Sequence, residues 1–345
     1  MAKRVALVLG SGGARGYAHI GAVQVLVERG YEIAGIAGTS MGAVIGALQA
    51  ADKLADYTDW VTSLGPRDVL RLMDASPFGG GAIKLERVLG RMTEILGADT
   101  RIEDLPIPYT AIASDLGARR EVWFTSGPVD VAIRASVAIP GVISPIMVNG
   151  RLMVDGGLLN PLPVDAVAGV DSDFTVAVSL SGWSPRDFNS PAKATSEARP
   201  PAEWLDGFRR TAAGVFANDW VASVLARFGR HDDAVEDGVP APEPDQARFG
   251  PAPPGLGITH VASLALDTMG ALITRFRLAA LPPDVLVTVD ADAAGMLEFH
   301  RAEELIALGR RLTAEALDAH EPEPPAAVAL PAADIDQPAE LDPGA

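Results

Sequence analysis

The chain contains no cysteine among its 345 residues. This absence excludes disulfide bonds, thiolate catalysis and metal sites with cysteine ligands, and it fits a reducing compartment such as the cytoplasm. Basic residues are also scarce. The chain has 28 lysines and arginines but 45 acidic residues, so the formal net charge is −17. Such a chain is a poor partner for nucleic-acid phosphates or an anionic membrane surface. Any membrane contact is therefore expected to be peripheral, transient and either hydrophobic or locally basic.

Long uninterrupted apolar runs are missing as well. The longest apolar stretch, 33–48, includes four glycines, Thr39 and Ser40, which suits a strand, a turn and a helix better than a membrane span. The run Val5–Leu9 follows two basic residues, as a signal peptide would, but it ends after five residues in a glycine-rich segment and is interpreted as a buried strand. Because 48% of the residues are hydrophobic, the chain can still bury a large core.

In the first half of the chain, apolar strand-like runs alternate with helix-like runs. Strands are expected at 4–9, 33–37, 108–113, 121–125 and 174–180, and helices at 17–27, 41–51, 54–64, 67–73 and 85–96. This alternation predicts an α/β fold, layered, with a mainly parallel central sheet flanked by helices. Asn149-Gly150 between two apolar triplets predicts a β-hairpin whose second strand ends at Asp155.

The second half is less regular. Helical spacing at 204–228 is followed by a loop at 231–257 with six prolines, and the segment 320–345 is acidic and rich in proline, which is typical of disorder. Helices are expected at 258–280 and 299–319, with a strand at 285–289. We therefore expect one domain over 4–319, with a core at 4–180, a variable helical insertion at about 183–257 and C-terminal helices at 258–319.

Ser40 is the first candidate for chemistry. Gly38-Thr39-Ser40-Met41-Gly42 places it in a G-x-S-x-G frame between an expected strand and an expected helix, which is the layout of a nucleophile elbow. Gly38 and Gly42 leave room for a tight turn, and the nearby helix N-terminus favours developing negative charge. An inert helix-capping serine is the alternative interpretation.

A glycine-rich loop at 10–16 follows the first expected strand. Its Gly12 and Gly13 could present backbone amides to an oxyanion. A dinucleotide-binding loop is the competing interpretation, but Arg15 stands where the strict pattern from Gly10 needs glycine, and the second strand ends without an acidic residue. A glycine-rich turn with no ligand is the third.

A nucleophilic serine needs a base. The chain has five histidines, and the order serine, acid, histidine would point to His260 or His300. None lies at a strand end with turn chemistry, so packing, capping or surface roles are favoured for all five: His19, His231, His260, His300 and His320.

Asp155-Gly156-Gly157 supplies another base at a strand end. The ordinary aspartate pKa of about 3.9 is low for a base acting on serine, and burial would raise it. A plain turn is the alternative interpretation.

The glycine-rich loop with Arg15, the G-x-S-x-G frame and Asp-Gly-Gly, in this order, resemble the patatin-like phospholipase family. The most similar members are bacterial ones related to the catalytic domain of neuropathy target esterase. The resemblance covers 4–180, including 135–141 and 160–164. It resumes at 277–279, 282–286 and 299–305.

This resemblance implies a patatin-like fold and a Ser–Asp dyad that uses no histidine. Ser40 would be the nucleophile, Asp155 the base, and the amides around Gly12 and Gly13 the oxyanion hole, with Gly156 and Gly157 completing the aspartate motif. Arg15 and Gly16 would belong to the supporting loop. Arg15 would fix that loop or meet a phosphate, and pairing with an acid is its plain alternative. Ser11 replaces the first glycine of the family's loop, which leaves open whether its amide faces the oxyanion.

The resemblance also implies the activity. We expect a serine acyl hydrolase of the lipase, phospholipase or lysophospholipase type, acting in lipid degradation on carboxylic esters. Its partner would be a lipid or lysophospholipid substrate, with no nucleic acid, no cofactor and no metal. An acyltransferase using the same dyad and a non-catalytic lipid-binding or regulatory protein remain open alternatives. Head group, acyl length, position of cleavage and oligomeric state are not specified by the sequence.

Overall fold

The computed structural model describes residues 2–72, 74–75, 83–84, 86–182 and 258–320. The insertion expected at 183–257 lies outside the described residues, and so do His231 and all but the first residue of the tail expected at 320–345.

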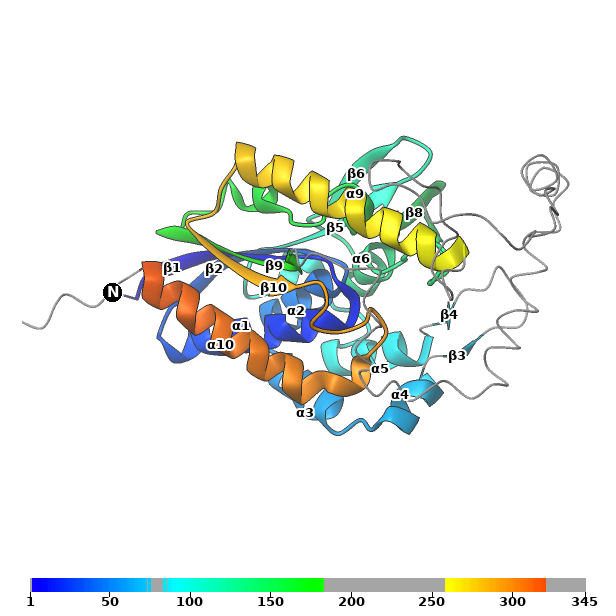
Figure 1. The fold of residues 1–345 in the computed structure, drawn as a ribbon, viewed down its shortest axis with the longest axis horizontal. Coiled ribbons are helices and arrows are strands. Elements are labelled where there is room, and N and C mark those ends of the chain that lie inside the picture. The colour runs from blue at the N-terminus through cyan, green and yellow to red at the C-terminus, as the bar shows by residue number, and fades with distance from the viewer. Residues whose placement is uncertain (1, 73, 76–82, 85, 183–257, 321–345) are drawn as a thin grey trace, which may run out of the picture.

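A central sheet organises the described part of the chain (Figure 1). Its strands follow the order β10-β9-β1-β2-β5-β8-β7, with β6 also paired to β5. They are β1 (Arg4–Leu9), β2 (Glu32–Thr39), β5 (Tyr109–Asp115), β6 (Arg120–Phe124), β7 (Ile146–Val148), β8 (Arg151–Asp155), β9 (Phe174–Gly182) and β10 (Val285–Asp290). The pairs from β10 to β5 are parallel, whereas β6 and β8 run antiparallel to β5. The expected α/β fold with a mainly parallel sheet is confirmed.

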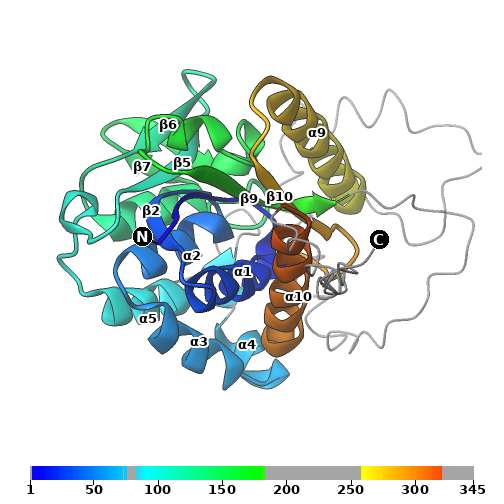
Figure 2. The same cartoon turned by 90° about the vertical axis from the view of Figure 1, so that its left-hand side faces the viewer.

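Helices cover both faces of this sheet. Figures 1 and 2 show α1, α2 and α10 on one side and α9 on the other. The helices are α1 (Tyr17–Glu28), α2 (Met41–Ala50), α3 (Leu54–Thr62), α4 (Pro66–Leu72), α5 (Glu86–Leu96), α6 (Val129–Ser136), α9 (Ile258–Ala280) and α10 (Ala302–His320). Short 3-10 turns are η1 (Gly13–Gly16), η2 (Ile102–Asp104), η3 (Gly156–Leu158), η4 (Val164–Val167) and η5 (Phe299–Arg301), and β3 (Asp74–Ala75) pairs with β4 (Ile83–Lys84).

The apolar residues of the strands divide between two cores. Val5, Leu7 and Leu9 of β1 join the larger core, which the sheet shares with α1, α2 and α10. Ala6 and Val8 point to the opposite face, where smaller side chains pack under η4 and α9. Alternating side chains on a strand point to opposite faces, so the uniformly apolar run of β1 is buried on both sides.

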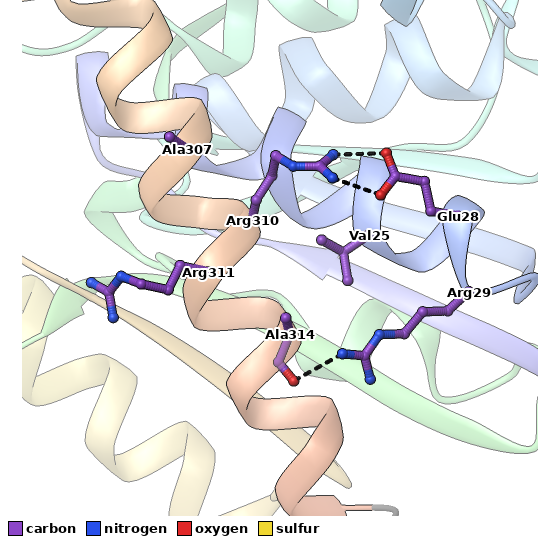
Figure 3. Close-up of a pocket in the computed structure, with 7 residues that line it drawn as sticks. All are labelled: Val25, Glu28, Arg29, Ala307, Arg310, Arg311 and Ala314. Atoms are coloured by element: carbon purple, nitrogen blue, oxygen red, sulfur yellow. Dashed lines mark hydrogen bonds and ion pairs between the residues drawn. The ribbon is translucent and has the colours of Figure 1, made fainter.

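On the helical side, α1 and α10 pack closely (Figure 3). A Cβ on Gly309 of α10 would overlap the carbonyl of Ala18 on α1, so the two backbones approach without intervening side chains. Arg310 holds Glu28 through two hydrogen bonds of 2.8 and 2.6 Å, one to each carboxylate oxygen. A shallow surface pocket lies in this groove, and its charged lining residues are already engaged in ion pairs: Glu28, Arg29, Arg310 and Arg311.

One junction in the sheet brings two distant strand ends together. Thr39, the last residue of β2, pairs with Ile112 of β5, and Asp155, the last residue of β8, pairs with the next residue, Ala113. Because β6 occupies one edge of β5 over Ala111–Asp115, β2 and β8 share the other edge. They approach from opposite directions and meet end to end, so the residues at their ends become neighbours.

Candidate active site

Ser40 sits on a strained turn between β2 and α2. Its φ of 57° and ψ of −123° lie outside the regions that side chains favour, as a nucleophile elbow requires. The flanking glycines permit the close packing of this turn. A Cβ on Gly38 would overlap the carbonyl of Gly42, and one on Gly42 would overlap the carbonyl of Leu9.

Ser40 and Asp155 are in direct contact. Ser40 Oγ donates a hydrogen bond of 2.5 Å to Oδ2 of Asp155. The other carboxylate oxygen, Oδ1, accepts a 2.7 Å bond from the Gly157 amide, which orients the carboxylate toward the serine. Gly156 lies so close to the Ile112 carbonyl of β5 that a Cβ there would overlap it.

The environment of Asp155 changes its acidity. Burial raises its pKa to about 6, against the lowering effects of the hydrogen bonds from Ser40 and Gly157. A carboxylate with this pKa is ionised at neutral pH and accepts a proton more readily than an exposed aspartate does. The pair therefore combines a hydroxyl with an adjacent base in a buried setting.

The glycine-rich loop runs alongside the elbow. A Cβ on Gly16 would overlap the side chain of Met41, the residue after Ser40. The Ser11 amide donates to the Pro161 carbonyl at 2.8 Å, so it is already engaged. Among the backbone hydrogen bonds of the described residues, none uses the amides of Gly12 or Gly13.

Arg15 is attached to the same loop. Its Nε donates to the Gly12 carbonyl at 3.1 Å, and one Nη donates to the Ala291 carbonyl at 2.8 Å. These two bonds attach the side chain to the glycine-rich loop and to the residue that follows β10. Gly13 adopts a positive φ of 57°, a conformation that glycine adopts without strain.

The histidines do not supply a base for Ser40 in the described residues, where the partner of its hydroxyl is Asp155. His19 is buried, and its Nε2 hydrogen-bonds the Gly10 carbonyl at 2.8 Å beneath the glycine loop. Burial lowers the pKa of His19 to about 4, so it is neutral at physiological pH. His300 lies in η5 and His320 ends α10.

Two further segments contact the candidate site residues. Asn160 is buried, and its carbonyl accepts a 2.9 Å bond from the hydroxyl of Thr39, next to Ser40. Ser136 Oγ accepts a 2.8 Å bond from the Ser40 amide. Both residues fall in stretches that resemble family segments, but residue type alone did not indicate these bonds, which span 121 and 96 positions of the chain.

Asn160 also belongs to a polar network on the other face. Its Nδ2 donates to Glu121 at 2.7 Å and to Asp165 at 3.1 Å. Arg277 of α9 donates to the same two carboxylates, at 3.0 and 2.9 Å. The network thus connects α9 to the segment that follows the Asp-Gly-Gly turn.

A family model and the sequences of curated relatives indicate the same family for this chain. The family model described as patatin-like phospholipase matches residues 7–168. An NTE family protein of Mycobacterium tuberculosis is 44% identical over 340 residues, covering 92% of each chain. The human patatin-like phospholipase domain-containing protein 6 is 32% identical over 197 residues, which are 54% of this chain and 14% of that protein. The crystal structure of VipD from Legionella pneumophila aligns with a TM-score of 0.41 and 12% identity, over 92% of this chain and 67% of that one.

Within the described ranges, no helix has both the length and the apolar character needed to cross a bilayer.

Proposed function

Because this chain belongs to the NTE family of patatin-like phospholipases, which implies lipid esterase activity, we propose that it hydrolyses carboxylic esters of lipids through an acyl-enzyme on Ser40. Asp155 is the base, and the amides of Gly12 and Gly13 stabilise the oxyanion. The observation that carries this proposal is the 2.5 Å hydrogen bond from Ser40 Oγ to Asp155. It joins a hydroxyl on a strained elbow to a carboxylate whose pKa burial raises to about 6.

Acylation begins with proton transfer from Ser40 Oγ to Oδ2 of Asp155 as the oxygen attacks the ester carbonyl carbon. The carbonyl oxygen becomes an anion, which the Gly12 and Gly13 amides stabilise by hydrogen bonds. The tetrahedral intermediate then collapses, and the bond to the alcohol portion of the lipid breaks. The departing alkoxide takes the proton from Asp155, which leaves the acyl group on Ser40.

Deacylation repeats these steps with water. Asp155 removes a proton from the water as its oxygen attacks the acyl carbon. Collapse of the second intermediate releases the fatty acid, and the proton on Asp155 returns to Ser40 Oγ. Since the same carboxylate must accept a proton and then give it up, a pKa near 6 suits both steps at neutral pH.

Ser40→Ala tests the assignment of the nucleophile. We expect loss of hydrolysis of a medium-chain ester and loss of covalent labelling by a fluorophosphonate, with the fold retained. The matched control is Ser63→Ala, which removes an exposed hydroxyl at the end of α3. Turnover or labelling of Ser40→Ala at the wild-type level would refute the proposal.

Three further measurements separate hydrolysis from acyl transfer and from lipid binding without turnover, and identify the substrate. Adding an acceptor alcohol to the wild-type reaction distinguishes an acyltransferase, which would form a new ester faster than free fatty acid. A binding protein would take up lipid stoichiometrically without turnover. A lipidomic screen of the wild type against Ser40→Ala then identifies the head group and acyl chain of the substrate. It also tests lysophospholipids as substrates.

A further inference from the structure

The last residue of α6 and the turn that follows it contact the backbone of both dyad residues. Ser136, the last residue of α6, accepts a hydrogen bond from the Ser40 amide at 2.8 Å. Two residues later, the Ala138 carbonyl accepts a hydrogen bond from the Asp155 amide at 2.9 Å. We name this three-residue segment, Ser136-Val137-Ala138, the dyad bridge.

The hydroxyl of Ser136 has a defined orientation. It donates its single proton to the Ile112 carbonyl at 2.5 Å, so a lone pair is left to face the Ser40 amide. Ile112 is the β5 residue that pairs with Thr39 at the end of β2. The hydroxyl thus ties the strained elbow to the strand on which β2 and β8 meet.

The dyad bridge is buried and is hydrogen-bonded to the residues on either side of it. Ser136 and Ala138 are fully buried. The Val137 amide donates to Ile133 within α6 at 2.9 Å, and the Val137 carbonyl accepts from Ile139 at 2.8 Å. α6 packs against β5, β8 and α2, which are the elements that carry or flank Ser40 and Asp155. Because the dyad bridge is anchored on these elements, its contacts hold the backbones of Ser40 and Asp155 in fixed positions relative to each other.

The hydrogen bond to Ser136 Oγ also determines which acceptor the Ser40 amide faces. An amide that donates to Ser136 Oγ is not directed at an oxyanion. Its bond instead holds Ser40 at φ 57°, a conformation that persists only when its surroundings enforce it.

We propose that Ser136 is a positioning residue that, with Ala138, sets the spacing and orientation of Ser40 relative to Asp155. The inference rests on the proposed dyad function. Ser136 touches no reacting atom and acts through the amide of Ser40, so its loss lowers the rate of the chemical step and leaves substrate binding unchanged. Misplacing reacting groups by about 1 Å reduces rates by roughly 100-fold.

The test compares two buried serines. Ser136→Ala removes the hydroxyl of the dyad bridge. Ser114→Ala removes another fully buried hydroxyl on β5, one that has no hydrogen-bond partner among the described residues. For Ser136→Ala we expect kcat on a soluble ester and the rate of fluorophosphonate labelling to fall about 10- to 100-fold, with KM changed less than twofold. Ser114→Ala should keep wild-type kcat.

Ser136→Thr and Ser136→Cys separate positioning from stability. Threonine keeps the hydroxyl but adds a methyl group to a packed site. The Ser136→Thr variant should therefore have a lower melting temperature than the wild type while it retains most of kcat. Cysteine fills the same space, but its thiol is a poorer hydrogen-bonding group than a hydroxyl. The Ser136→Cys variant should therefore have a reduced kcat. Under the proposal, activity across the Ala, Cys and Thr variants follows the hydroxyl and not the melting temperature.

Three results would overturn the inference. They are kcat within twofold of wild type in folded Ser136→Ala, an equal loss in Ser114→Ala, or activities that follow melting temperature across the Ser136 variants. Wild-type labelling at Ser40 serves as the reference. If the wild type is not labelled there, the dyad proposal fails. If it is labelled and Ser136→Ala is labelled equally fast, the inference about Ser136 fails alone.

Discussion

Ser40 Oγ lies 2.5 Å from Oδ2 of Asp155, although 115 positions separate the two residues in the chain. The contact follows from β5, whose neighbouring residues Ile112 and Ala113 pair with the ends of β2 and β8. The sheet therefore brings the two residues together, and the contacts of their backbones with the end of α6 complete the geometry of the pair.

The first prediction concerns the pH dependence of activity. Asp155 must be ionised to act as the base, and its pKa is about 6 because burial outweighs its hydrogen bonds. We expect kcat/KM for a soluble ester to rise with pH through a midpoint near 6, and to be about tenfold lower at pH 5 than at its plateau. Circular dichroism at each pH checks that the enzyme stays folded. A midpoint near 4, or a flat profile from pH 5 to 8, would contradict the assignment.

The second prediction concerns stability. The folded-state pKa of Asp155, about 6, lies above its ordinary value of 3.8, so folding favours the protonated form. This contribution is fully present below about pH 3.8 and is lost as the pH rises through 6, by about 3 kcal/mol in the free energy of unfolding. Asp155→Asn does not ionise. At pH 4 the unfolded aspartate is already more than half ionised, so the stability of Asp155→Asn relative to the wild type should be about 2.5 kcal/mol greater at pH 8 than at pH 4.

Urea unfolding at both pH values measures this difference. Asparagine suits the site, since its oxygen can accept from the Gly157 amide and its NH2 group can donate to Ser40. Asp59→Asn, at an exposed position on α3, is the control for simple loss of a charge. Equal pH dependence in Asp155→Asn and the wild type would rule out a buried, destabilising carboxylate.

The third prediction tests the glycine loop. Gly13→Ala places a Cβ 2.5 Å from the Met296 carbonyl, which accepts from the Ala14 amide, and at a φ of 57°. Gly150→Ala has a similar φ of 75° in the β7–β8 turn but open space around its Cβ, so it controls for backbone strain of about 1–2 kcal/mol. We expect fluorophosphonate labelling to slow at least tenfold in Gly13→Ala alone. Equal labelling rates would argue against a catalytic role for this loop.

The fourth prediction concerns the network around Arg277. Its two nitrogens hold Asp165 and Glu121, and its side chain is 28% exposed. Arg277→Met leaves both carboxylates without this cation and should lower the free energy of unfolding by about 1–3 kcal/mol. Arg311→Met breaks an exposed i,i+4 pair with Glu315 on α10 and should cost no more than about 0.5 kcal/mol. Urea unfolding of both variants measures the two free energies of unfolding. Similar losses of stability in Arg277→Met and Arg311→Met would contradict the structural role of Arg277.

Much of the fold could be predicted from the sequence because its signals are local. The runs at 4–9 and 174–180 are apolar and β-branched, and both form strands of the sheet, β1 and β9. Asn149-Gly150 forms the turn of the expected hairpin, with both residues at positive φ. The helix expected at 258–280 has these bounds in α9. Each signal lies within the segment that it describes.

What could not be predicted depends on contacts between distant segments. No pattern in the sequence predicts the helix at 129–136, because α6 has only eight residues and is stabilised by its burial against β5 and β8. The contact of Ser136 with the Ser40 amide is not predictable either, because a serine in a short helix has many possible hydrogen-bond partners. The pairing of Ser40 with Asp155 is implied by the resemblance to the family, whereas the strand β5 that both chain segments share is not indicated by any local pattern.

The end-to-end meeting of β2 and β8 limits how the site can vary. A strand advances by about 3.4 Å per residue, and a slip of one residue turns its side chains to the opposite face. If β8 moved along β5 by one residue, Asp155 would be carried beyond hydrogen-bond distance of Ser40. A change of this register therefore moves Asp155 by at least one whole residue, and a lineage that acquired such a change would lose the contact outright.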